Sequence, residues 1–137
     1  MAEINYEVLI NKAFDMLKMA YVPYSHFHVG AALLCKDGTI FTGCNIENSA
    51  YGPSNCAERT AIFKAVSEGY KKFSAIAVVG GLEGNVTEYC TPCGVCRQVM
   101  REFCSRDFKI ICAKSPSDYK EYTLDQLLPQ SFSLSDF

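Results

Sequence analysis

The sequence lacks an excess of positive charge. Its 137 residues contain 13 Lys and Arg against 15 Asp and Glu, so the formal net charge is −2. Proteins that hold nucleic acids normally present basic surfaces that attract the phosphate backbone. A polynucleotide substrate is therefore disfavoured, and no nucleic-acid partner is expected.

The sequence also lacks any hydrophobic run approaching the roughly 20 residues that span a bilayer. Near the N-terminus, Glu3 and Glu7 stand where a secretory signal would carry basic residues followed by an apolar segment. We therefore expect no membrane association and no export, and we predict a soluble, cytoplasmic protein.

Internal repeats, linkers and low-complexity stretches are missing as well. Apolar residues make up 49% of the chain, which is enough for one compact core but hardly for two. We predict a single domain over residues 1–137.

Hydrophobic patterning predicts alternating strands and helices. The predicted helices cover residues 6 to about 23, 56–68 and 92–104, and the predicted strands cover residues 27–35, 39–44, 73–79 and 108–113. The last two strands flank a helix, which indicates a βαβ unit with parallel strands. Thr123 and Gln126 have the spacing of a capping box for a short final helix. The pattern as a whole favours helices on both faces of a mixed sheet.

Three cysteines at two predicted helix starts could share one metal ion. Cys56 opens one helix, and Cys93 and Cys96 open another. The helix dipole lowers the pKa of thiols at a helix N-terminus, and residues three apart lie on one helix face. Three protein ligands leave the fourth position of tetrahedral zinc open to water, as in catalytic zinc sites.

Two charged residues follow Cys56 closely. Glu58 is not needed for coordination, so it is free to move protons as a general acid and base. Arg59 could offset the negative charge that three thiolates bring to a divalent cation. We assign catalysis to Glu58 and electrostatic support to Arg59.

These metal segments, together with segments 27–32, 45–48, 97–99 and 127–132, resemble the short, single-domain form of the cytidine deaminase family. The resemblance covers nearly the full length. It implies a three-layer α/β/α fold around a mixed five-stranded sheet, with one zinc ion per subunit. The implied activity is hydrolytic deamination of cytidine and 2′-deoxycytidine in pyrimidine salvage.

The resemblance also implies which residues bind the nucleoside. Asn45 and Glu47 match residues that hold the ribose hydroxyls, with Ile46 between them, and their side chains can donate and accept the hydrogen bonds required. Phe27 matches a residue that packs against the nucleoside. The backbone at Ala57 would bind the 2-oxygen of the pyrimidine.

The short form of the family is a homotetramer in which neighbouring subunits complete each pocket. Tyr51 and Phe132 match residues that reach across subunits. This assembly is implied by the resemblance alone.

Other interpretations stay open at this point. Cys93 and Cys96 alone could form a redox pair, and Cys90 could complete a closed, structural four-thiolate site. Cys90 precedes Pro92, however, and is therefore expected on the loop before the helix. A non-catalytic zinc-binding module and a deaminase of a related aminopyrimidine nucleoside are the rival functions.

The remaining cysteines and both histidines are given no chemistry. Cys35, Cys44, Cys104 and Cys112 lie in strand or helix patterns and are predicted to be small core residues. The two histidines, His26 and His28, could ligate zinc, but partly exposed polar positions beside Phe27 suit them better.

Overall fold

A computed structural model describes residues 4–137, so the first three residues of the predicted domain lie outside it. Within the described residues, five strands and four α-helices follow one another. They are α1 (Tyr6–Asp15), β1 (Phe27–Cys35), β2 (Ile40–Cys44), α2 (Ala57–Ser67), β3 (Phe73–Leu82), α3 (Gly94–Phe103), β4 (Lys109–Ser115), β5 (Asp118–Thr123) and α4 (Leu124–Leu127). Short 3₁₀ turns cover Leu17–Met19 and Leu134–Asp136.

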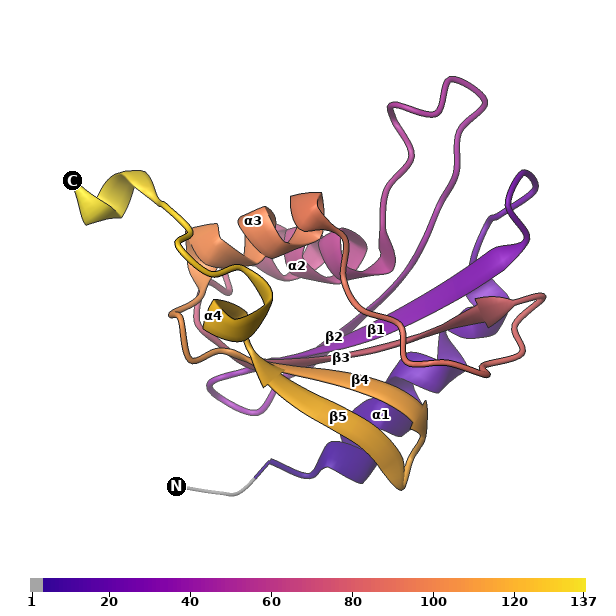
Figure 1. Cartoon of the computed structure of the whole chain (residues 1–137), viewed down its shortest axis with the longest axis horizontal. Helices are drawn as coiled ribbons and strands as arrows, with labels where there is room; N and C mark the ends of the chain where they lie inside the picture. The colour runs from indigo at the N-terminus through magenta and orange to yellow at the C-terminus, as the bar shows by residue number, and fades with distance from the viewer. Residues whose placement is uncertain (1–3) are drawn as a thin grey trace.

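The strands form one mixed sheet in the order β2-β1-β3-β4-β5. β3 and β4 are parallel, as the predicted βαβ unit requires, and the other neighbouring pairs are antiparallel. Figure 1 shows α2 and α3 along one face of the sheet and α1 along the other. The predicted three-layer α/β/α fold with a mixed five-stranded sheet is confirmed.

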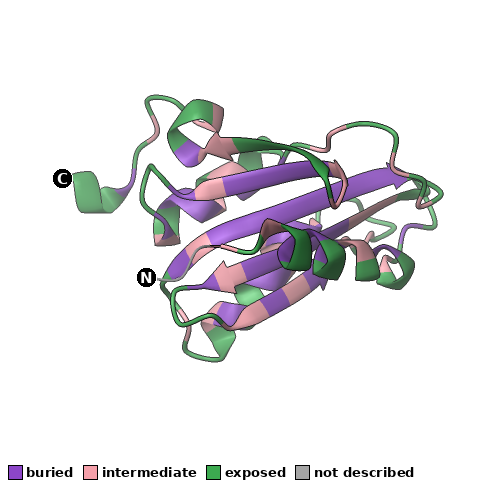
Figure 2. Ribbon diagram, turned by 90° about the horizontal axis from the view of Figure 1, so that it is seen from below, coloured by how far each residue is buried: buried purple, intermediate pink, exposed green. Residues whose placement is uncertain are grey.

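Alternating side chains of the central strands supply two cores. Leu33, Ile76 and Ile110 point toward α2 and α3, whereas Ala32, Ala77 and Ile111 point toward α1. These residues are fully buried, and Figure 2 shows the central strands as the most continuously buried part of the chain. Burial on both faces explains why the strands are nearly continuous hydrophobic runs.

Several predicted boundaries were wrong. The first helix ends at Asp15 instead of continuing toward Pro23, because Tyr21 leaves the helical path to form a β-bridge with Ile46. The second and third helices begin one and two residues later than predicted, at Ala57 and Gly94.

The strands also differ in extent from the prediction. β3 continues three residues past Val79, to Leu82. β5 had no predicted range, because its sequence DYKEYT is largely exposed at the sheet edge and carries no apolar alternation. The capping box of Thr123 and Gln126 is present at the start of α4.

Close backbone contacts position the two long helices. A Cβ atom on Gly43 of β2 would lie 2.4 Å from the Ala57 carbonyl oxygen and 2.6 Å from the Ala61 nitrogen. On the opposite face, a Cβ on Gly30 would lie 2.1 Å from the Ala13 carbonyl oxygen of α1. Only glycine permits these distances. Gly43 therefore sets the position of the first turn of α2, where Cys56 and Glu58 lie.

Within residues 4–137, no helix combines the length and the apolar character needed to cross a membrane.

Candidate zinc and active site

Two cysteines occupy the N-cap positions of α2 and α3. Cys56 precedes the first residue of α2, and Cys93 precedes that of α3. The Cys93 Sγ accepts a hydrogen bond from the Cys96 backbone N–H at 3.4 Å, so Cys96 stands in the first turn of α3. The prediction placed Cys93 inside the helix, whereas the structure places it at the N-cap. The side chains of Cys93 and Cys96 still lie close together.

The three sulfur atoms have the spacing of a zinc site. Cys56 Sγ lies 3.7 Å from Cys93 Sγ, which lies 3.5 Å from Cys96 Sγ. Tetrahedral zinc with Zn–S bonds of about 2.3 Å separates its sulfur ligands by about 3.8 Å. All three atoms lie within 4.8 Å of one another. The residues present therefore fit a zinc ion with three thiolate ligands.

Cys90 is not part of this group among the described residues. Its half-buried thiol packs against the backbone of β3, where a Cβ on Gly80 would lie 2.9 Å from its Sγ. Burial raises the pKa of Cys90 to about 12. This geometry disfavours the closed four-thiolate site.

Hydrogen bonds and charge prepare Cys56 to act as a thiolate. The Cys96 thiol, together with the Arg59 guanidinium, lowers the pKa of Cys56 well below the usual thiol value, although burial opposes this shift. Arg59 donates from Nη2 to Cys56 Sγ at 3.3 Å. The hydrogen bond between Cys96 and Cys56, together with burial, raises the pKa of Cys96. Arg59 therefore stands where the predicted electrostatic support requires it.

Glu58 is the buried carboxyl group beside the thiols. Only 3% of its surface is exposed. Burial raises the pKa of Glu58 to about 7, and the charge of Cys56 adds to the shift. A carboxyl group with a pKa near neutrality can both accept and donate a proton in that range. This is the behaviour required of a general acid and base.

Asn45 joins the end of β2 to the start of β1. Its Oδ1 accepts from the Val29 N–H at 2.9 Å, and its Nδ2 donates to the Phe27 carbonyl at 2.8 Å. One amide hydrogen and one lone pair are left for other partners. The Phe27 ring lies against β3, where a Cβ added to Gly80 would meet the Phe27 Cε2 at 3.0 Å. The Asn45 side chain is therefore bonded directly to the backbone of Phe27.

Glu47 faces a hollow of about 360 Å³, which is in the size range of small-ligand sites. Tyr24, Ser25, Tyr51 and Ser54 line it with Glu47. The Tyr24 and Tyr51 rings meet edge to face, with centroids 6.1 Å apart. The structure thus brings Glu47 and Tyr51 together.

The loop that carries Glu47 also leads to the first zinc ligand. Ile46 and Asn55 exchange two backbone hydrogen bonds, of 2.9 and 2.8 Å. Asn55 immediately precedes Cys56, and its side chain donates to Thr60 Oγ1 on α2. The segment around Ile46, whose side chain is exposed, is thereby tied to the start of α2.

Phe132 lies on the C-terminal tail and does not line the Glu47 hollow. Its carbonyl accepts from Gln98 Nε2 on α3 at 3.1 Å. Arg101 and Arg106 both bond Ser131, and Arg101 also forms an ion pair with Asp136 at 2.8 Å. The tail is thus firmly held, while the Phe132 side chain stays 57% exposed.

The histidines do not join the thiol cluster among residues 4–137. His28 Nδ1 lies 2.7 Å from the Leu17 carbonyl oxygen. His26 lies in the turn before β1 with a positive φ of 60°. Their expected roles as partly exposed polar residues agree with the exposure of both.

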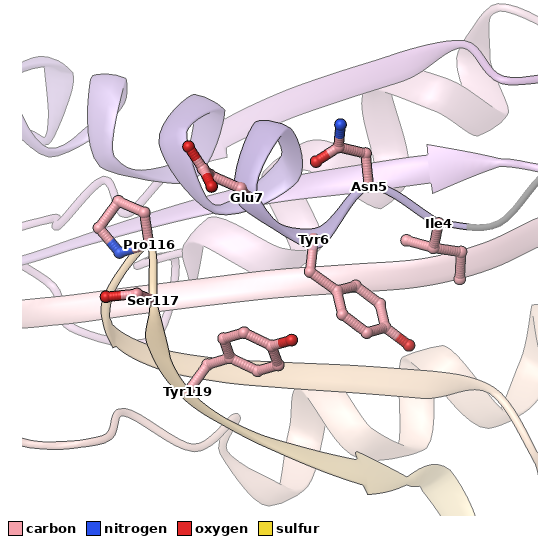
Figure 3. A pocket seen from close by; sticks show the side chains of 7 residues that line it. All are labelled: Ile4, Asn5, Tyr6, Glu7, Pro116, Ser117 and Tyr119. Carbon is pink, nitrogen blue, oxygen red and sulfur yellow. The ribbon is translucent and has the colours of Figure 1, made fainter.

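Another hollow, of about 630 Å³, lies beside α1 and the turn between β4 and β5. Figure 3 shows the side chains that line it, among which the Tyr6 and Tyr119 rings meet edge to face. It contains no cysteine or histidine, and α1 covers the face of the sheet opposite α2 and α3. It is separate from the thiol cluster.

Three thiols and a buried carboxyl group at two helix starts have the arrangement of a catalytic zinc site with one open position, the class of site found in zinc hydrolases. Residues 4–112 match the cytidine and deoxycytidylate deaminase zinc-binding region. The chain belongs to this family.

Relatives and solved structures agree over nearly the whole chain. The cytidine deaminase of Sporosarcina psychrophila is 53% identical over 130 residues, which cover 95% of this chain and 93% of that protein. The cytidine deaminase of Halalkalibacterium halodurans is 50% identical, with coverages of 95% and 96%. The crystal structure of cytidine deaminase from Burkholderia pseudomallei has a TM-score of 0.84 and 42% identity, and the match covers 96% of this chain and 100% of that one.

The sequence patterns missed Tyr24, Ser25 and Asn55, which the structure places beside predicted site residues. Asn55 carried a usable signal, because it directly precedes a predicted ligand. Tyr24 and Ser25 carried none, since the contacts they make with Glu47 join residues more than 20 positions apart.

Proposed function

We propose that this protein hydrolyses cytidine and 2′-deoxycytidine to uridine and 2′-deoxyuridine, with release of ammonia. One observation carries the proposal: the buried Glu58 carboxyl group lies in the same helix turn as one of three thiols spaced for a single zinc ion. Family membership and the similarity to cytidine deaminases support it.

Cys56, Cys93 and Cys96 would hold the zinc ion. Zinc with three protein ligands acidifies water, and this supplies the nucleophile for attack on C4 of the cytosine ring. Arg59 offsets part of the thiolate charge through its bond to Cys56. A redox pair would leave the third thiol and Glu58 without a role.

Glu58 moves the protons of the reaction. It accepts a proton from the attacking water and delivers it to N3 of the ring. It then takes the remaining proton from the hydroxyl group now on C4 and delivers it to the amino group, so that the C4 carbonyl forms as the C4–N bond breaks and ammonia leaves. A group with a pKa of about 7 is suited to take up and release protons in turn near neutral pH.

The nucleoside would be held by residues on three sides. Glu47 accepts from a ribose hydroxyl, and Asn45 donates to the sugar with the amide hydrogen that the fold leaves free. Phe27 provides an apolar wall. Ala57 is the first residue of α2, so its N–H lacks an intrahelical acceptor and can donate to the 2-oxygen of the ring. Ile46 holds the loop between Asn45 and Glu47 in register.

We propose in addition that the enzyme is a cytoplasmic homotetramer that acts in pyrimidine salvage. Tyr51 and Phe132 are 72% and 57% exposed in the single chain, so both aromatic side chains are available for contacts with neighbouring subunits. Contacts with neighbouring subunits would cover both and bring Phe132 to another subunit's pocket.

A panel of substrates tests the proposed activity. Purified, zinc-loaded protein is incubated with cytidine, 2′-deoxycytidine, free cytosine and cytidine 5′-monophosphate, and ammonia release is followed. Both nucleosides should turn over, and free cytosine should react far more slowly because it lacks the sugar. Equal turnover of free cytosine would refute the ribose assignment. Light scattering on the same sample measures the mass of the assembly.

A further inference from the structure

Ser25 bonds two of the proposed nucleoside-binding residues at once. Its hydroxyl donates to Glu47 Oε2 and accepts from the Phe27 backbone N–H at 3.0 Å. A hydroxyl group can donate once and accept as well, so one side chain serves both bonds. The Ser25 hydroxyl therefore connects the Glu47 carboxylate to the backbone of Phe27.

The backbone of the turn that carries Ser25 also binds the other carboxylate oxygen of Glu47, Oε1. The backbone N–H groups of Tyr24 and Ser25 both donate to Glu47 Oε1 at 3.1 Å. An ionised carboxylate offers about four acceptor positions. Three of them are used by this turn, and the one that remains is on Oε2, the oxygen that Ser25 bonds. Ser25 thus determines where the last acceptor position points.

The turn itself is anchored at both ends. The His26 N–H donates to the Val22 carbonyl at 3.0 Å, and the Glu83 N–H donates to the His26 carbonyl at 2.7 Å. His26 adopts a φ of 60°, which non-glycine residues adopt only when surrounding contacts hold them there. The loop that carries Ser25 is therefore held in place by contacts that include Glu83, the residue that follows β3.

We propose that Ser25 is a positioning residue that aims Glu47 at a sugar hydroxyl and keeps it in register with Phe27. The inference rests on the proposed ribose role of Glu47, and Ser25 acts through its hydrogen bond to Glu47. In support, the Ser25 hydroxyl is the main cause that holds the pKa of Glu47 below its usual value. Glu47 then remains a pure acceptor at neutral pH.

The test compares Ser25→Ala with wild-type enzyme on cytidine. The KM should rise about tenfold, the loss expected when a hydrogen bond to a charged group is removed, while kcat stays within about twofold. Zinc content should not change. Ser25→Thr, which keeps the hydroxyl, should recover most of the wild-type KM.

Ser67→Ala is the matched control. It removes a serine hydroxyl that bonds only the Lys64 carbonyl at the opposite end of α2. Its kinetics should equal those of the wild type. If Ser25→Ala does not fold, Ser25→Cys preserves the side-chain volume with a weaker donor and should show the same change in KM.

A substrate without the 2′- and 3′-hydroxyl groups separates positioning from general loop damage. For 2′,3′-dideoxycytidine, Ser25→Ala and wild type should have KM values within about threefold of each other. For cytidine, the double variant Ser25→Ala/Glu47→Gln should be no worse than Glu47→Gln alone, because Ser25 has no further route to the sugar.

Three results would overturn the inference, and they are distinguishable from failure of the proposed function. An unchanged KM for cytidine in Ser25→Ala would show that Ser25 does not position Glu47, while the proposed deaminase activity would stand. An equal rise in KM for dideoxycytidine shows a structural lesion. Wild-type kinetics for Glu47→Gln would show that Glu47 does not bind the ribose, and Ser25 could then not act by positioning it. A wild-type protein that turns over no nucleoside refutes the proposed function itself.

Discussion

Replacing Glu58 by Gln would remove the proton-transfer group with the smallest change in shape. The side chain is 3% exposed at the start of α2, beside Cys56, so a smaller residue would leave a cavity next to the zinc ligands. Glutamine fills the same volume and still forms hydrogen bonds, but it cannot accept and release a proton. The change therefore separates chemistry from packing.

The expected loss of kcat is large. One positioned acid or base typically contributes 10²- to 10⁴-fold, and here the same carboxylate serves several transfers in succession. We expect a loss at or beyond the upper end of that range. Ammonia release, zinc content and nucleoside binding should be measured on one preparation, and only ammonia release should fall.

The burial of the Glu58 carboxyl group also predicts a pH dependence of the free energy of unfolding. In the metal-free protein the pKa of Glu58 is raised from 4.5 to about 7, so the folded state binds this proton more tightly than the unfolded state. The contribution of Glu58 to the free energy of unfolding should therefore fall as pH rises from about 4.5 to about 7, by at most roughly 3 kcal/mol. The metal-free Glu58→Gln protein should lack this loss, which urea unfolding at pH 5 and pH 8 can measure.

Either measurement could refute the reasoning. A folded, zinc-loaded Glu58→Gln protein that turns over cytidine at more than about a tenth of the wild-type rate would remove Glu58 from the mechanism. Identical pH dependence of unfolding for wild type and variant would show that Glu58 does not carry a raised pKa.

The other predictions concern the metal and the packing beneath it. Cys56→Ala should lose zinc and activity together, and full zinc in the purified variant would contradict the ligand assignment. Cys90→Ser should keep zinc near one per chain, because this thiol lies outside the cluster; metal analysis showing zinc loss would restore the closed site. Gly43→Ala should push α2 away from β2, lower the free energy of unfolding by about 1 to 3 kcal/mol and reduce kcat/KM, whereas Gly52→Ala, which meets nothing within 4 Å, should leave the unfolding midpoint unchanged.

The sequence by itself determined the features that depend on local spacing. Cys93 and Cys96 are three residues apart at a helix start, and Glu58 is two residues from Cys56, so their proximity follows from helix geometry once the helices are recognised. The capping box of Thr123 and Gln126 is local in the same way. The βαβ unit was predictable because parallel strands joined by a helix allow essentially one arrangement.

Only the tertiary structure decided the features that depend on contacts between distant segments. The β-bridge between Tyr21 and Ile46 ended the first helix early, although the local pattern favoured a longer one. β5 pairs through its backbone, so its polar side chains gave no pattern to recognise. The raised pKa of Glu58 and the bond from Ser25 to Glu47 arise from burial and from proximity across the fold, and neither leaves a trace in residue spacing.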